Sequence, residues 1–69
     1  MHEPYIYEIG VEGILPGHWS VWFEGMELRA EPNGSTTLRG LLVDQAALFS
    51  VLARIQALNL ELISVLRLR

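Results

Sequence analysis

The sequence contains no cysteine, which excludes disulfide bonds and zinc sites built from thiolates. Its two histidines, His2 and His18, lie far apart and lack the spacing of metal ligands, so we expect neither a metal nor another cofactor. Basic side chains are also scarce, since five Lys and Arg stand against eight Asp and Glu. The resulting net charge of −3 argues against a nucleic-acid partner, which would require a basic face for phosphate contacts.

Long hydrophobic runs are absent too. No apolar stretch approaches the roughly 20 residues of a membrane span, so we expect no membrane segment. The first ten residues, MHEPYIYEIG, lack the basic segment and apolar core of a signal peptide. A cytoplasmic location is therefore expected.

What the chain does contain is a high share of apolar side chains, 51% of 69 residues. Residues 1–69 predict one small domain. A domain of this size buries only about 60% of the surface that its unfolded chain exposes. Some apolar side chains must then lie on the surface, which predicts a homo-oligomer, with a dimer as the first expectation.

The order of the elements follows from hydrophobic periodicity. Alternating apolar and polar residues predict β-strands, and these cover Tyr5–Leu15, Met26–Glu31, Thr36–Val43 and Leu60–Arg69. Asn33-Gly34 predicts a tight hairpin turn between the middle two strands, because both residues tolerate a positive φ. Asp44 is a good N-cap for a helix that ends near Asn59. The apolar stripe of this helix is formed by Leu48, Val51, Leu52, Ile55 and Leu58.

The segment GHWSVWFEG, residues 17–25, concentrates the aromatic side chains. Trp19, Trp22 and Phe23 stand at i, i+3 and i+4, which predicts a short helix over Trp19–Glu24. In one interpretation the rings fill the open end of a small core while His18 caps the helix. In another, His18 and a tryptophan form a ligand or partner pocket. A third places one tryptophan in the core and the other in a dimer interface.

The last strand carries the remaining candidate residues. Leu60, Leu62, Leu66 and Leu68 share one parity and are predicted to face the core. Ile63 and Val65 then lie on the outer face of the sheet, where they predict an interface. Arg67 could bind an anionic ligand or a partner carboxylate, or belong to a solvated chain end.

The element order predicts an α+β fold of ferredoxin-like type, βαββαβ, with a very short first helix and both helices on one face of an antiparallel sheet. A right-handed crossover would place the last strand parallel to the second hairpin strand, with the first strand between them. The alternative is a ββαβ unit completed by dimerisation.

The box HWSVWFEG and the helix start DQAAL resemble a family of small uncharacterised prokaryotic proteins with an HWxxWFxG motif. The resemblance covers nearly the whole chain. Its helix–strand half is weakly similar to ACT-type regulatory domains. That similarity implies a ferredoxin-like module that binds small ligands between subunits.

No catalytic residue is predicted. No serine lies in a G-x-S-x-G elbow, and on one strand face Glu8 and Glu12 stand roughly 13 Å apart, too far for paired acid–base catalysis. We therefore expect a non-catalytic interaction module that associates with itself or with a protein partner. The alternatives are a sensor that binds a small-molecule metabolite between subunits and an accessory subunit of an enzyme.

Overall fold

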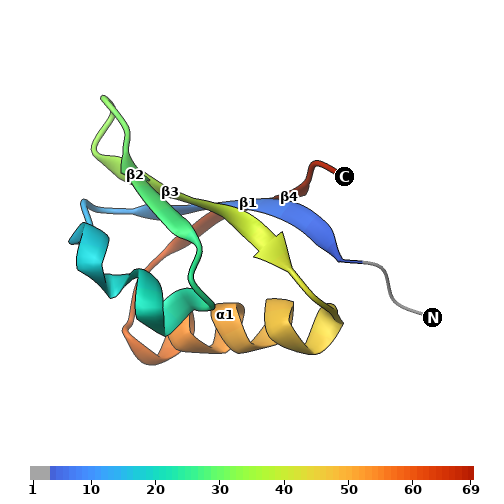
Figure 1. Ribbon diagram of the computed structural model, residues 1–69. Coiled ribbons are helices and arrows are strands. Elements are labelled where there is room, and N and C mark those ends of the chain that lie inside the picture. Colours follow the sequence, from blue (N-terminus) through green and yellow to red (C-terminus); the bar gives the residue numbers. More distant parts are fainter. Residues whose placement is uncertain (1–3) are drawn as a thin grey trace.

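The computed structural model describes residues 4–69 and has an α+β fold (Figure 1). Its elements follow the order β1 (Tyr5–Glu12), the 3-10 helix η1 (Gly17–Phe23), β2 (Glu27–Ala30), β3 (Ser35–Leu42), α1 (Gln45–Ala57) and β4 (Leu62–Arg67). The strands form one antiparallel sheet in the order β2-β3-β1-β4. Both helices lie on the same side of this sheet (Figure 1).

Strand β1 occupies the middle of the sheet and pairs antiparallel with both β3 and β4. It therefore lies between two strands that run parallel to each other, as the crossover argument predicted. The predicted alternation is also present, because Ile9 and Val11 are fully buried. The strand ends at Glu12 rather than at Leu15, since Gly13 turns the chain with a φ of 92°.

The hairpin between β2 and β3 forms where it was predicted, but Asn33 acts differently from the expectation. Only Gly34 has a positive φ, of 88°, whereas Asn33 does not. The Asn33 side-chain oxygen instead accepts hydrogen bonds from the backbone N–H of Ser35 at 3.1 Å and from its hydroxyl at 2.6 Å. The turn is thus fixed by one permissive backbone position and one side chain.

Helix α1 supplies most of the cover for the sheet. Its first turn is capped by Asp44, whose carboxylate accepts from the backbone N–H of Ala47 at 2.8 Å. The buried side of the helix follows the predicted stripe, with Leu48, Val51 and Ile55 in the core. Beyond the helix, Asn59 takes a left-handed conformation with a φ of 59°, consistent with its predicted place at the helix end.

The prediction for the two faces of the last strand is wrong for the residues that follow Ser64. Val65 pairs with Ile9, which is buried on the helix side of the sheet, and residues opposite each other in an antiparallel pair share a face. Val65 therefore lies on the helix side, although it was predicted on the outer face. Leu66 pairs with Glu8 and lies on the outer face, although it was predicted in the core.

An irregularity in the β1–β4 register explains part of this difference. The register shifts between Gly10 and Val11, so that Gly10 pairs with Ser64 whereas Val11 pairs with Leu62. Ile63 is the extra residue of a β-bulge, which breaks the alternation on which the prediction relied. Gly10 makes the close approach possible, because a Cβ at this position would lie 2.9 Å from the Ser64 Oγ.

The Asp44 cap provides a test of how α1 begins. We expect Asp44→Ala to lower the free energy of unfolding by about 1 kcal/mol, because one backbone N–H of the first turn loses its acceptor. Asp44→Asn keeps a side-chain oxygen at the same place and is the matched control. Denaturant unfolding followed by circular dichroism measures both variants. Equal loss in both would show that the carboxylate charge, not the capping oxygen, stabilises the helix.

Candidate functional site

The aromatic segment forms a 3-10 helix rather than the α-helical turn suggested by the spacing of its rings. It begins after Pro16, whose φ is −61°, and the Trp19 N–H donates to the Pro16 carbonyl at 3.0 Å. Side chains three residues apart eclipse one another in this helix type. The rings of Trp19 and Trp22 are accordingly stacked, with centroids 5.1 Å apart and planes inclined by 29°.

The three rings of this segment have different environments. Phe23 is fully buried within the core, where Met26 is also buried, whereas Trp19 is half-buried and packs against the core. Trp22 is 45% exposed. The segment is thus divided between core and surface. η1 packs on β2 and α1, so Phe23 and Trp19 complete the core beside β2.

His18 does not cap this helix, contrary to the interpretation of the ring cluster as a core plug. The N-cap residue is Pro16, and no side chain makes a capping hydrogen bond. The reason is positional, since η1 begins at Gly17 and His18 already lies inside its first turn. The His18 side chain is exposed instead.

Strand β4 is the second candidate region and lies at one edge of the sheet. All six of its residues are exposed. Among the described residues, five large apolar side chains between 62 and 68 are between 37% and 52% exposed: Leu62, Ile63, Val65, Leu66 and Leu68. The predicted interface residues Ile63 and Val65 are thus both accessible, but they lie on opposite faces of one strand.

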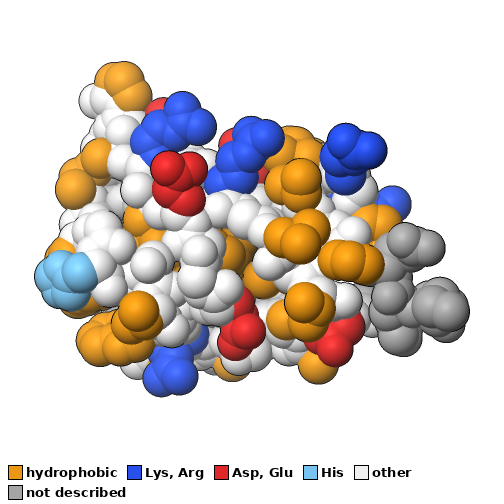
Figure 2. Space-filling model, in the orientation of Figure 1, with side chains coloured by type: hydrophobic (Ala, Val, Ile, Leu, Met, Phe, Trp, Pro, Cys, Tyr) orange, Lys and Arg blue, Asp and Glu red, His pale blue; other side chains and the backbone are white. Residues whose placement is uncertain are grey.

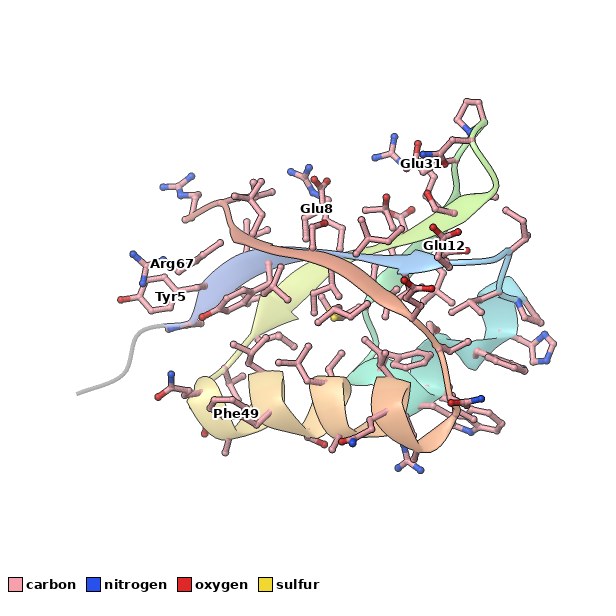
Figure 3. The ribbon with its side chains drawn as sticks, turned by 180° about the vertical axis from the view of Figure 1, so that it is seen from behind. Tyr5, Glu8, Glu12, Glu31, Phe49 and Arg67 are labelled. Atoms are coloured by element: carbon pink, nitrogen blue, oxygen red, sulfur yellow. The ribbon has the colours of Figure 1, made fainter. Side chains whose placement is uncertain are left out.

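Arg67 is held against the N-terminal end of β1. Its guanidinium carbon lies 4.2 Å from the centroid of the Tyr5 ring, in a cation–π contact that Figure 3 shows beside the chain end. Tyr7 is its direct partner in the β1–β4 register. The contact places the positive charge of Arg67 beside the first residue of β1.

The outer face of the sheet is uncovered by any described helix. At one end it is apolar, because Leu41 pairs with Ile6, and Leu68 donates its backbone N–H to the Ile6 carbonyl at 2.7 Å. Two residues further along β1 the same face is polar, because Arg39 forms a salt bridge with Glu8 at 3.5 Å. Figure 2 shows exposed hydrophobic side chains grouped beside a row of basic side chains along the upper rim.

The sequence-predicted residues do not meet in one pocket. Trp19, Trp22 and Phe23 belong to η1, whereas Ile63, Val65 and Arg67 belong to β4. A shallow, open hollow lies on α1 and is lined by Ser50, Ala53, Arg54 and Ala57, so no candidate residue contributes to it. The structure therefore offers two separate surfaces, one aromatic and one at the sheet edge.

Leu66 is a surface residue that the sequence analysis assigned to the wrong face of β4. It was assigned to the core by the parity of the leucines, yet it is 52% exposed on the outer face. A signal was present at Gly10, since a glycine in the middle of a strand marks a bulge or a close approach of another backbone. Phe49, 58% exposed on α1, was not singled out either (Figure 3).

Two further observations concern the described residues alone. In residues 4–69, no group of three or more His, Asp or Glu side chains is placed to hold a metal ion. His2 lies outside that range. None of the helices in the same part of the chain has the length and apolar character needed to cross a membrane.

Comparison with known proteins identifies the family but not an activity. The chain belongs to the family described as Domain of unknown function (DUF8691), whose model matches residues 6–66. This match confirms the resemblance to a small uncharacterised family. No curated protein and no solved structure matches the chain. The similarity to ACT-type domains therefore stays a prediction.

The unequal burial of the rings predicts unequal effects of their removal. We expect Phe23→Ala to lower the free energy of unfolding by about 3–5 kcal/mol, because it removes a fully buried ring. Trp22→Ala should cost about 1 kcal/mol or less, since it removes an exposed ring and one stacking contact. Thermal unfolding of the two variants at one protein concentration measures the difference. A larger loss for Trp22→Ala would place Trp22 in a buried contact.

Proposed function

We propose that this chain is a non-catalytic interaction module of the cytoplasm that acts as a homo-oligomer, with a dimer as the first expectation. The observation that carries the proposal is the edge strand β4, whose six residues are all exposed although four of them are Leu, Ile or Val. An accessible group of apolar side chains on this scale is typical of an interaction surface. A partner that covered it would remove the apolar area from water.

The sheet topology supports a ferredoxin-like assignment. The strand order β2-β3-β1-β4 and the antiparallel pairing of β1 with both neighbours are those expected of a βαββαβ chain. We propose that η1 takes the place of the first helix. The fold leaves one sheet face and one sheet edge available for association.

A second candidate function is the binding of a metabolite between subunits, as the ACT resemblance implies. The stacked pair of Trp19 and Trp22 favours it, because Trp22 presents a partly exposed ring beside the exposed His18. A planar ligand could stack on that ring. A ligand that protected this ring from a soluble quencher such as acrylamide would support this candidate over a module that only associates.

Substitution in β4 tests the leading proposal. We expect Leu66→Asp to convert the oligomer into a monomer, because a carboxylate at the covered edge would lose its water on association. Ile63→Asp should act in the same direction, since Ile63 lies on the same face of the strand. Light scattering behind a sizing column gives the molar mass of each variant.

Val21→Asp is the matched control, because Val21 is 75% exposed on η1, away from β4. Its molar mass should equal that of the parent chain. A parent chain that is monomeric at every concentration would refute the proposal. Tryptophan emission across the same dilution series separates the two surfaces, since a red shift on dissociation would place Trp19 or Trp22 in the contact.

A further inference from the structure

We propose that two copies of this chain associate edge to edge, through antiparallel pairing of β4 with β4 of the second copy, so that their sheets become one. This inference rests on the proposed self-association and names the surface that performs it. The competing arrangement is packing of the two outer sheet faces against each other.

The two edges of the sheet differ in how they are protected. Strand β2 has only four residues, and its outward-facing side chains include Glu27 and Arg29. Short length and charge are the usual means by which edge strands avoid pairing. Strand β4 is longer and carries the sequence LISVLR, with a single charge at its end. It has the features of an edge that pairs.

The backbone groups of β4 alternate between β1 and the free edge. The Leu68 N–H donates to the Ile6 carbonyl at 2.7 Å, so Leu68 directs its backbone groups toward β1. In an antiparallel ladder, every second residue does the same. Leu66 therefore also faces β1, whereas the N–H and C=O groups of Val65 and Arg67 point to the free edge. These groups can bond to a second strand without disturbing the β1–β4 ladder.

The regular part of β4, residues 64–68, matches itself in antiparallel orientation. With Leu66 opposite Leu66 of the second copy, Val65 faces Arg67 of the other strand, and Ser64 faces Leu68. The free N–H and C=O groups of Val65 and Arg67 then form the hydrogen-bonded pairs, and Leu66 forms the closer, non-hydrogen-bonded pair. Every pair also joins residues on the same face, because Val65 and Arg67 lie on the helix side.

Charge favours this antiparallel orientation and a second copy as the occupant. Glu61 precedes β4, and its carbonyl accepts from the N–H of Glu12 at 2.9 Å, so two glutamates lie together at the start of the strand. The end of the strand is basic, with Arg67 and Arg69. Antiparallel pairing brings the basic end of each copy toward the acidic end of the other. Parallel pairing would place like charges side by side.

Edge pairing also covers more of the apolar surface of β4 than face-to-face packing would. Val65, 42% exposed, lies on the helix side, while Leu66 and Ile63 lie on the outer face. In Figure 3, β4 crosses in front of the other strands, with Phe49 projecting from the helix below it. A partner on the outer face would leave Val65 in water. A second edge strand would contact the side chains of β4 on both faces of the sheet.

A single introduced thiol tests the arrangement, because the chain has no cysteine of its own. In Leu66→Cys, the two Cα atoms of a non-hydrogen-bonded pair would be about 4.5 Å apart, within the range of a disulfide. We expect mild oxidation to convert most of this variant into a covalent dimer on a non-reducing gel. Leu41→Cys is the matched control, since Leu41 is on the same face and 57% exposed, but on β3. It should remain uncrosslinked.

Proline substitution gives an independent test of the backbone pairing. Val65→Pro removes an N–H that points to the free edge, whereas Val65→Thr retains it. We expect Val65→Pro to raise the dimer dissociation constant by about 30-fold relative to Val65→Thr, with an unchanged circular dichroism spectrum. Sedimentation equilibrium of the two variants measures this ratio.

The outcomes separate this inference from the proposed self-association. Crosslinking of Leu41→Cys but not of Leu66→Cys, in a chain that is dimeric by mass, would overturn edge pairing and leave self-association standing. A dimer that survives Val65→Pro with unchanged affinity would do the same. If Val65→Pro fails to fold, the comparison of the two cysteine variants decides. A parent chain that is monomeric at every concentration would refute both proposals.

Discussion

The structure depends on how one 13-residue helix, α1, and the shorter η1 share the cover of a four-stranded sheet. α1 contributes Val51 and Ile55 to the core, and η1 contributes Phe23 to the same cluster. Ile9 and Val11 of the central strand β1 are fully buried on the helix side of the sheet, while all six residues of β4 are exposed. The two helices thus cover the central strand and leave the edge strand β4 exposed.

Much of the fold could be predicted because its determinants are local. Asp44 caps α1 through a contact only three residues away, and the alternation of Ile9 and Val11 records one buried face. Asn33-Gly34 marks the hairpin by its residue types alone. These features depend only on residues that are close together in the chain, so they can be recognised without knowing which distant segments pack against them.

The faces of β4 could not be predicted because they depend on contacts made far along the chain. The position of Leu66 is set by its pairing with Glu8, and the bulge at Ile63 is set by the approach of Ser64 to Gly10. An edge strand that is half exposed on both faces also lacks the clear polarity that alternation requires. The sequence therefore predicted the faces of Leu62 and Ile63 correctly and those of Val65 and Leu66, beyond the bulge, wrongly.

The contrast between the two sheet edges has a consequence for the size of the assembly. Strand β2 is short and carries Glu27 and Arg29, features that disfavour strand addition at this edge. Association through β4 alone would pair the apolar edge of each described sheet with that of the other copy. The charged strand β2 would then form both edges of the joined sheet. Growth would then terminate at a closed pair, and the sheet could not extend into a fibre. A small apolar chain would in this way keep its association finite.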